Sequence, residues 1–567
     1  MKVGYTKHYS RNKTETPQTE QASPNQEKNN AGGFSFVISD WDRLERFLIM
    51  GSEGGTYYVG ERKLTRDNAK CVERCLQADG ARTVQMIVDV SDEGRAAKNT
   101  PALFALAMAA ACGSEKQELS QSDIETRKLA LEALPKVARI GTHLFIFSQF
   151  VDAFRGWGTG LRNAIANWYL DMELGRCAYQ VVKYPQRTTE QGEKASVWSH
   201  RDLMRKAHPV TKDKDRDRLF RYIVNGGFGD KLPSRVSKPL NILVGTEKVK
   251  KAKTAKEAAE LIEQYNLPHE VVPKELSGDP VVWKALLPSM PLNATIRNLG
   301  RMTANGLLTP MGEETGMVIE RITDAEYVSR SRIHPINVLA ALKTYQSGGG
   351  FRGKLTWKAD QSIVDALDEA FYMSFKNVEA TGKRHLLAID CSGSMSSRCM
   401  GMEMLSNREA AAVMALATMK AEKQTHVVGF SNGSGFQVKG QSRYGWGTGI
   451  DTLNISSRMR LDTVCSTMQK FGWGGTDCAL PMLYALDRKL EVDVFCVYTD
   501  NETWAGSIHP HEALRNYRKA INPEAKLVVL GTAQTEFSIA DPNDAGMLDI
   551  AGFDSAAPQV IANFVRD

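Results

Sequence analysis

The sequence predicts a multidomain protein in which a helical part precedes an α/β part with a doubly wound parallel sheet. The chain has 567 residues, and single hydrophobic cores rarely grow past about 250–300 residues. From residue 33 to about residue 380, apolar residues recur with helical periodicity. After Gly382, short apolar runs alternate with helical patterns, which is typical of a parallel sheet covered on both faces. We therefore expect a helical domain at 33–380 and an α/β domain at 381–567.

The first 32 residues differ from both domains in composition. They are rich in Thr, Gln, Asn, Glu and Lys and have almost no apolar residues, so we expect 1–32 to be a disordered tail. This segment has no apolar core, and no run in the chain approaches the ~20 apolar residues of a membrane span. Neither a secretory signal nor a membrane partner is therefore expected. The nine cysteines are scattered without a CxxC pair, which indicates reduced thiols in a cytoplasmic protein.

The helical part shows short loops between successive amphipathic segments. Thr100 and Pro101 are typical of a helix start, because threonine caps well and proline suits the first helical position. Antiparallel helix pairs stacked as a solenoid explain the pattern. Strands are expected only at 83–90 and 316–321. The expected helices are 102–112, 124–140, 144–154, 161–172, 199–207, 215–225, 254–265, 280–287, 292–304, 335–346 and 360–376.

The α/β part begins with the apolar run that ends at Ile389. We expect strands at 385–389, 426–431, 493–499 and 526–532. The expected helices between and after them are 406–422, 459–470, 478–489, 511–521 and 557–565. In such sheets the ligand site lies at the carboxyl ends of the strands.

Polar oxygens gather at these predicted strand ends. Asp390, Ser392 and Ser394 leave the first strand on one small loop. Thr476, after a pair of glycines, and Asp500, at the end of another apolar run, can complete a shell around a hard divalent cation. The alternative interpretation is a polar turn, or a metal that is purely structural.

No catalytic residues are expected. The sequence contains neither GxxxxGK[ST] nor HExxH, and no general base stands beside Asp390. The glycine-rich stretch 156–160 does not follow a strand, so it is weak as a phosphate loop. We therefore predict a protein that is not an enzyme.

The net charge of +6 is unevenly distributed. Residues 381–567 hold 18 Lys+Arg and 20 Asp+Glu, which leaves 72−18 = 54 basic and 66−20 = 46 acidic residues, or +8, in the first 380. This excess indicates a polyanion partner for the helical part, although a surface suited to solubility would look the same.

Two stretches of the helical part combine cations with aromatic residues. One contains Arg155, Trp157 and Arg162, and the other runs from Lys183 and Arg187 to the segment 198–209. Within a helix capped by Ser199, the side chains of Arg201, Arg205 and His208 fall at i, i+4 and i+7, on one face. Such a row can track phosphates while nearby aromatic rings stack on bases. An ordinary amphipathic helix with a charged outer face is the alternative.

The loop Asp390–Ser394, the GGT segment and Asp500 resemble the metal-ion-dependent adhesion site of von Willebrand factor A domains. The resemblance implies Ser392, Ser394 and Thr476 as direct ligands, and Asp390 and Asp500 as ligands held directly or through water. The expected ion is Mg²⁺, which prefers octahedral oxygen and retains waters.

Longer motifs resemble the TROVE-module Ro autoantigen family: RGWGTGLRNAIANWY, VWSHRDLMRKAHP, MPLNATIRNLGRMT and IADPNDAGMLDIAGFD. The phrase AGGFSFVISDWDRLERFLIMGSEGGTYY is similar to bacterial members. The resemblance covers roughly residues 34–567 and implies a monomeric ring of HEAT-like repeats closed by a von Willebrand factor A-like domain.

This resemblance also implies an RNA partner. The family binds Y RNAs on an outer basic surface and passes single-stranded 3′ ends of misfolded RNA through the ring. The Y-RNA face would include Lys183, Arg187, His200, Arg201 and Arg205, with Arg155, Arg162, Arg297 and Arg301 at the interior or rim. The segment TTEQGEKASV at 188–197 is longer than the family pattern.

The function expected from the sequence is therefore that of a non-enzymatic RNA-binding protein acting in RNA quality control or decay as a ribonucleoprotein. Bacterial relatives suggest an exoribonuclease such as polynucleotide phosphorylase, tethered through the RNA. Two alternatives stay open: a metal-dependent protein-interaction scaffold without direct RNA binding, and a nuclease with its metal at Asp390 and Asp500.

Overall fold

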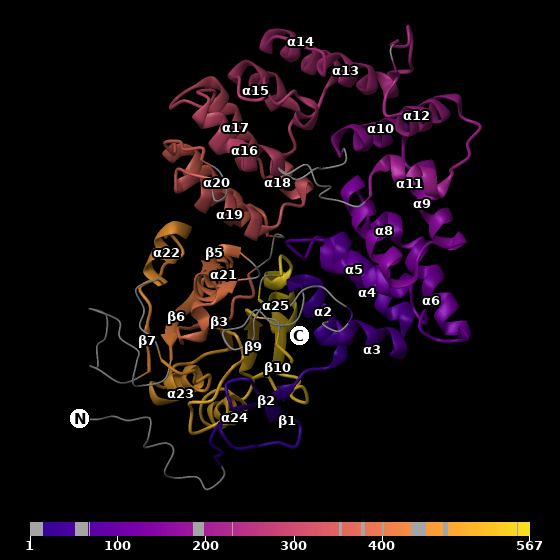
Figure 1. The fold of residues 1–567 in the computed structure, drawn as a ribbon. Coiled ribbons are helices and arrows are strands. Elements are labelled where there is room, and N and C mark those ends of the chain that lie inside the picture. Colours follow the sequence, from indigo (N-terminus) through magenta and orange to yellow (C-terminus); the bar gives the residue numbers. More distant parts are fainter. Residues whose placement is uncertain are drawn as a thin grey trace. The chain divides into compact units, whose positions relative to one another are not determined.

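The structure is a computed structural model of the chain that describes residues 15–51, 66, 69–184, 198–229, 231–350, 354–375, 380–399, 402–431, 449–468, 474–533, 535–552 and 554–566. The chain divides into two compact units (Figure 1). We call residues 72–94 and 98–374 the helical unit, and residues 1–71, 95–97 and 375–567 the sheet unit. No described helix has the length and apolar character needed to cross a membrane.

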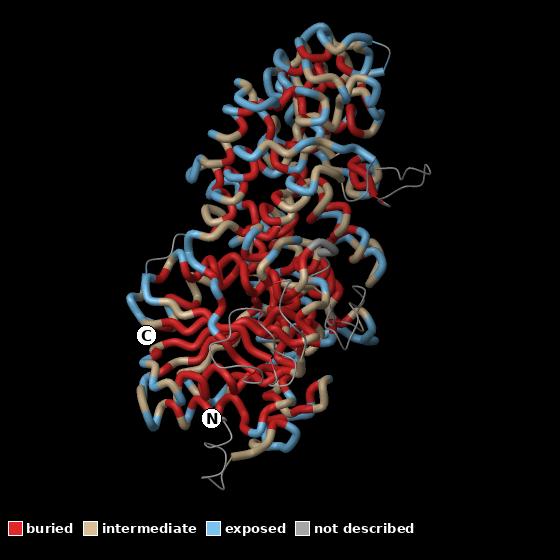
Figure 2. Tube along the Cα trace, turned by 90° about the vertical axis from the view of Figure 1, so that its left-hand side faces the viewer, coloured by how far each residue is buried: buried red, intermediate tan, exposed pale blue. Residues whose placement is uncertain are grey.

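The helical unit is a succession of short helices, each packed on helices close to it in sequence. Helix α5 packs on α8, α13 on α14, α14 on α15, and α19 on α20. Most of these helices have one buried and one exposed face (Figure 2), as an amphipathic solenoid requires, whereas α5 is buried on all sides. The α-helices are α3 (Lys70–Ala78), α4 (Gly80–Glu93), α5 (Thr100–Ala110), α6 (Gln121–Glu132), α7 (Leu134–Val137), α8 (Gly141–Arg155), α9 (Thr159–Asp171), α10 (Leu174–Lys183), α11 (His200–Ala207), α12 (Lys214–Asn225), α13 (Asn241–Val249), α14 (Ala255–Tyr265), α15 (Pro280–Leu286), α16 (Leu292–Ala304), α17 (Glu313–Thr323), α18 (Ala325–Ser331), α19 (Pro335–Gln346) and α20 (Gln361–Met373). Short 3₁₀ turns are η2 (Lys238–Leu240), η3 (His269–Val271) and η4 (Leu287–Ser289).

The prediction of two strands in this part was wrong. Residues 83–90 lie inside α4, and residues 316–321 lie inside α17. In α4 the side chains of Val84, Ile87, Val88 and Ser91 are buried, which is the 3.6-residue period of a helix rather than the alternation of a strand. The valines and isoleucine of this segment favour strands in isolation, but packing against neighbouring helices stabilises the helix here.

The sheet unit contains a six-stranded sheet in the order β11–β9–β8–β3–β6–β7. All neighbours are parallel except β7, which pairs antiparallel with β6 at the edge. The strands are β3 (Arg384–Asp390), β6 (Gln424–Phe430), β7 (Ile450–Thr452), β8 (Val494–Thr499), β9 (Lys526–Gly531) and β11 (Met547–Ala551). The helices are α2 (Asp40–Met50), α21 (Asn407–Ala421), α22 (Leu461–Met468), α23 (Leu480–Asp487), α24 (Pro510–Ala520) and α25 (Ala557–Arg566), and a small hairpin pairs β4 (Arg398–Cys399) with β5 (Met402–Ser406).

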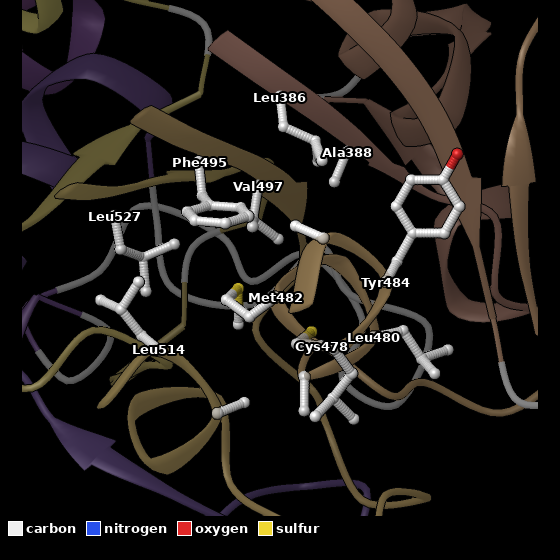
Figure 3. Packing of buried hydrophobic residues seen from close by; sticks show 14 of the residues in the cluster. Leu386, Ala388, Cys478, Leu480, Met482, Tyr484, Phe495, Val497, Leu514 and Leu527 are labelled. Atoms are coloured by element: carbon white, nitrogen blue, oxygen red, sulfur yellow. The ribbon is translucent and has the colours of Figure 1, made fainter. Parts of the chain in front are cut away.

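Helices cover both faces of this sheet, as predicted. On one face Leu386, Ala388 and Phe495 pack in a common core with residues of α23 and α24 such as Met482 and Leu514 (Figure 3). On the other face, the buried hydroxyl of Tyr498 lies 3.1 Å from that of Thr418 on α21. Side chains of successive strand residues therefore point alternately into two cores.

The N-terminal segment is ordered from Glu15, so the predicted disorder of 1–32 was wrong for its described residues. β1 (Gln26–Lys28) and β2 (Phe34–Val37) form a three-stranded antiparallel sheet with β10 (Phe537–Ser538) near the end of the chain. Few of these residues are apolar, and their order comes instead from buried hydrogen bonds: the side chain of Gln18 alone bonds Asp477, Thr503 and Gly506. Residues 1–14 lie outside the described residues.

The domain boundary also differs from the prediction, because residues up to 71 and 95–97 belong to the sheet unit. Arg46 of α2 is buried and forms an ion pair with Asp549 of β11, while its guanidinium also donates to the carbonyl of Thr535 (2.9 Å). Arg95 donates to the carboxylate of Asp554 (2.9 Å). These ion pairs link residues that precede residue 98 to the C-terminal domain. The partners lie far apart in sequence, so sequence spacing alone does not reveal the pairs.

Candidate metal centre and cationic surfaces

The first predicted ligand, Asp390, lies fully buried at the carboxyl end of β3. Its Oδ1 accepts a hydrogen bond from the backbone N–H of Ser392 (2.8 Å), and its Oδ2 accepts one from the hydroxyl of Thr499 (2.7 Å). The first bond folds the chain back in an Asx turn. The hydroxyls of Ser392 and Ser394 consequently lie 3.0 Å apart on the same small loop.

Asp500 lies at the same edge of the sheet, because it directly follows β8 and β8 is the parallel neighbour of β3. Its Oδ1 accepts a hydrogen bond from the backbone N–H of Glu502 (3.2 Å). Its Oδ2 is buried and accepts no well-formed hydrogen bond from any residue that the structure describes, although the side chain of Ser394 opposes the rise in the pKa of Asp500. A buried carboxylate oxygen without a donor is costly unless a cation or water meets it.

Thr476 reaches this edge from the loop that precedes α23. The backbone N–H of Gly393 donates to the carbonyl of Gly474 (3.0 Å), which joins that loop to the Asp390–Ser394 loop. Thr476 is buried, and its carbonyl accepts a hydrogen bond from the backbone N–H of Ala505 (2.9 Å). The structure thus brings together the three segments that carry the five predicted metal ligands.

The electrostatics of this edge fit a bound cation. Burial, reinforced by the charge of Asp390, raises the pKa of Asp500 to about 8. Burial also raises the pKa of Asp390. Two buried carboxylates that repel each other, together with the adjacent hydroxyls of Ser392 and Ser394 and the buried Thr476, form a hard-oxygen donor set that suits Mg²⁺. No group of three or more His, Cys, Asp and Glu side chains able to hold a metal ion occurs in the described parts of the chain, so hydroxyl oxygens have to contribute at this centre.

Several residues around this centre were missed by the sequence analysis. Gln18 donates from its side-chain nitrogen to Oδ1 of Asp477 (2.8 Å), next to Thr476. Asn30 donates to the side chain of Glu502 (2.7 Å), two residues after Asp500. The guanidinium of Arg408 donates to the carbonyl of Ser392 (3.0 Å). Of these residues, only Arg408 could have been suspected from the sequence, because it lies at the start of a predicted helix that follows the Asp390–Ser394 loop. Nothing in the sequence around Gln18 or Asn30 indicates their contacts with this centre.

The basic row predicted on α11 lies at the surface of the helical unit. Ser199 caps this helix in a capping box with Asp202. Arg201, Arg205 and Lys206 are exposed, and so is His208, which ends the helix in the left-handed conformation (φ 49°). Neither Arg201 nor Arg205 has an ion pair or hydrogen bond with another described residue, whereas the Lys206 ammonium lies 5.7 Å from the Trp157 ring centroid.

His200 was predicted on this RNA-binding face, but its side chain lies in the core. It is 5% exposed, its Nδ1 lies 2.7 Å from the hydroxyl of Tyr169, and its ring packs edge-on against Phe145. Burial lowers the pKa of His200 to about 4. As the first residue of α11, it points inward while Arg201 points outward, which the spacing of the cations could not indicate.

Lys183 acts on the same histidine ring as Arg297 and Arg301, although more than a hundred residues separate it from them in sequence. Burial lowers the pKa of His269, opposed by Glu270, and the charges of Lys183, Arg301 and Arg297 lower it further. The charges of all three cations therefore act on one ring. Arg297 and Arg301 are exposed, whereas Lys183 is half-buried. Arg187 lies outside the described residues.

The last two predicted cations behave differently from each other. Arg162 is exposed on α9. Arg155 is half-buried and donates from Nη1 to the carbonyl of Ala110 (2.7 Å), at the end of α5. Arg155 therefore satisfies a helix C-terminus, and a ligand could reach only the remaining face of its guanidinium.

Two family models match the chain. The TROVE domain matches residues 27–347, and the Ro60 vWA domain matches residues 384–565. The second match contains every residue of the candidate metal centre, and the first contains every described residue of the cationic surfaces.

Characterised relatives match over nearly the whole chain. The "RNA-binding protein RO60" of Deinococcus radiodurans is 40% identical over 97% of this chain and 97% of its own length. The protein of the same name from Caenorhabditis elegans is 35% identical over 97% of this chain and 91% of its own length. The crystal structure of the Deinococcus radiodurans RO (RSR) protein superposes with a TM-score of 0.68, at 40% identity, over 93% of this chain and 99% of that one. The chain belongs to the Ro family, in which a TROVE domain precedes a von Willebrand factor A domain.

Proposed function

We propose that this protein binds RNA through the exposed cations of its helical unit. The observation that carries the proposal is the row of Arg201 and Arg205, which are exposed and have no counter-ion among the described residues. Exposed cations without a counter-ion are available to phosphates, and phosphate contacts supply most of the affinity in nucleic-acid complexes. The relatives named RNA-binding proteins support the same reading.

The RNA partners we propose are Y-like small noncoding RNA and misfolded RNA with single-stranded 3′ ends. In this role the protein acts in RNA quality control in the cytoplasm and is not an enzyme. Any cleavage belongs to an exoribonuclease, such as polynucleotide phosphorylase, tethered through the RNA. Incubation of the pure protein with end-labelled RNA and Mg²⁺ is expected to leave the RNA intact, and shortening of the label would overturn this part.

A salt titration tests the phosphate row directly. The variant carrying Arg201→Ala and Arg205→Ala should bind a structured RNA more weakly, with a log-affinity against log-salt slope shallower by about two units, about one for each lost phosphate contact. The matched control carries Arg221→Ala and Arg330→Ala, which remove the same charge from exposed arginines already paired with Asp217 (2.8 Å) and Glu326 (3.7 Å). Equal slopes for the two double variants would remove α11 from the RNA interface.

We further propose that the centre at the edge of β3 holds Mg²⁺. Asp390, Ser392, Ser394, Thr476 and Asp500 would supply its oxygens, and the orphaned Oδ2 of Asp500 supports the assignment. A bound Mg²⁺ supplies positive charge that neutralises the two buried carboxylates and can attract one further acidic group. Calorimetric titration of Mg²⁺ into the chelator-treated protein should give a binding isotherm that Asp500→Asn weakens at least tenfold; no heat for the parent protein would refute it.

This centre also favours a second function, a metal-dependent protein-interaction scaffold without direct RNA binding. Purification distinguishes the two readings. A protein that retains RNA shows a raised A260/A280 ratio and shifts a structured RNA in a gel. A ratio typical of clean protein together with no gel shift would favour the scaffold.

A further inference from the structure

A cavity of about 200 Å³ opens beside the converging cations of the helical unit. Its walls come from α10, from the segment around η3 and from the turn that precedes α16. Tyr179 and Lys183 line it on the α10 side, Pro268 and Glu270 on the η3 side, and Ser289 and Met290 on the third side. The walls thus combine apolar and aromatic residues with a comparable share of polar and charged groups.

The charges around this cavity are unbalanced. The Lys183 ammonium lies 3.3 Å from the hydroxyl of Tyr179 and 5.3 Å from the centroid of its ring. The guanidinium of Arg301 lies 5.9 Å from the ring centroid of Trp283, whose ring in turn lies 6.1 Å from that of His269. Lys183 lines the cavity and Arg301 lies near it, against the Trp283 ring, whereas Glu270 is the one carboxylate of the lining. The charge of Arg297 also acts on the His269 ring.

The carboxylate of Glu270 is the polar group that distinguishes this cavity from a plain anion site. Its Oε2 is buried and accepts no well-formed hydrogen bond from a described residue, although Nδ1 of His269 lies 3.2 Å away. A free phosphate would be repelled by this carboxylate. A ligand that carries an N–H donor at one end and a phosphate at the other satisfies both the carboxylate and the cations.

We propose that the cavity receives one unpaired nucleotide of the bound RNA, with an amino-bearing base (cytosine, adenine or guanine) inside and its phosphates against Lys183, Arg297 and Arg301. The volume is below the roughly 300–1,000 Å³ of drug-sized sites, so it suits a single base rather than a longer segment. Carboxylates accept hydrogen bonds from exocyclic amino groups of bases, and single-stranded RNA is read by such edge contacts together with aromatic faces. This inference rests on the proposed RNA-binding function.

A cavity-filling variant tests the inference without touching a charge. Ser289 is exposed at the rim, and its hydroxyl donates to the carbonyl of Leu286 (3.2 Å). Ser289→Trp should weaken binding of a hairpin RNA with a cytidine tail roughly tenfold or more, in the range of one lost base contact, with an unchanged salt slope. The matched control is Ser331→Trp, at an exposed serine that makes the same kind of bond to the carbonyl of Val328 (2.6 Å).

The base preference provides the second measurement. The parent protein should prefer a cytidine tail to a uridine tail on the same hairpin, and Glu270→Gln should reduce that preference, because an amide can also donate to the O4 of uracil. A 6-thioguanosine placed in the tail, which keeps an exocyclic amino group, should crosslink to the peptide that contains Tyr179 or to the one that contains His269.

The outcomes separate this inference from the function on which it rests. If the parent protein fails to bind the hairpin, the proposed function itself falls. If the parent binds and Ser289→Trp behaves like Ser331→Trp, with crosslinks confined to other peptides, RNA binding stands and the cavity has no part in it. Weaker binding by Ser289→Trp, equal for cytidine and uridine tails, would overturn the assignment of an amino-bearing base.

Discussion

The two candidate sites of this protein are built in opposite ways. At the edge of β3 the polar groups are buried, and Asp390 accepts bonds from Ser392 and Thr499, so the carboxylate is fixed before any ligand arrives. On α11 the cations of Arg201 and Arg205 are exposed and make no bond to another described residue. The first site is rigid and preorganised, whereas the second orders its side chains only against a partner.

This difference predicts which property, stability or binding, a substitution at each site will change. Buried polar networks are costly to break, because each removed partner leaves an unsatisfied group in a low-dielectric interior. Exposed long side chains contribute little to folding. Substitutions in the sheet unit should therefore act first on stability, and substitutions on the helical surface should act on binding alone.

Removal of the N-terminal segment should have the largest effect. A truncation of residues 1–37 takes away buried Phe36, the partner strand of β10 and the four side-chain hydrogen bonds of Gln18. Loss of a buried Phe with several buried hydrogen bonds should lower the free energy of unfolding of the sheet unit by at least about 4 kcal/mol. Denaturant unfolding measures this, with a truncation of residues 1–14 as the control that keeps every described contact. Equal unfolding midpoints for the two truncations would show that the N-terminal segment does not stabilise the sheet unit.

Arg46→Met should have the next largest effect. The substitution leaves the carboxylate of Asp549, which is 14% exposed, without its cation, and breaking a largely buried pair costs about 3–5 kcal/mol. Adding Asp549→Asn should recover part of the loss, since no net charge then stays buried. In the helical unit, Lys128→Met removes one partner of an exposed pair with Glu132 and should leave the unfolding midpoint within error. Similar losses for Arg46→Met and Lys128→Met would contradict the proposed contrast between the units.

The same contrast explains how far the sequence could predict the molecule. The alternation of strands and helices after Gly382 and the strand-end positions of Asp390 and Asp500 are local patterns, and the structure confirms them. The order of residues 15–32 depends on the hydrogen bond between Gln18 and Thr503, which lie far apart in sequence. No local sequence pattern encodes such a contact. Short edge elements such as β7 and β10 were missed for the same reason, since their pairing partners define them.

The sequence predicted that this unit is helical, but it predicted the individual helices less well. Short helices such as α10 and α13 were missed, and α4 was mistaken for a strand, because packing against neighbouring helices stabilises segments that are only weakly patterned. Exposure of Arg201 could be predicted from the helical period. The inward position of His200, its immediate neighbour, depends on Tyr169 and Phe145, which lie on other helices.

His200 gives the third prediction, a dependence of stability on pH. Its pKa is about 4 in the folded protein, below the ordinary value of 6.5, so the folded state favours the neutral ring. The stabilisation is fully present above pH 6.5 and is lost as the pH falls toward 4, by about 2 kcal/mol between pH 7 and pH 5. His200→Gln removes this titration and should flatten the acid limb of helical-unit stability. An acid limb as steep as that of the parent protein would show that the ring of His200 reaches solvent.

The smallest expected effect on stability comes from Arg201→Ala combined with Arg205→Ala. Both side chains are exposed and without partners in the described chain, so the free energy of unfolding should change by no more than about 0.5 kcal/mol. RNA affinity should nevertheless fall, because phosphate contacts are made only in the complex. Unfolding curves and salt titrations on the same preparations check both halves. Loss of stability and affinity together would mean that these arginines hold the helical unit together, and that weaker RNA binding is a consequence of unfolding rather than of lost phosphate contacts.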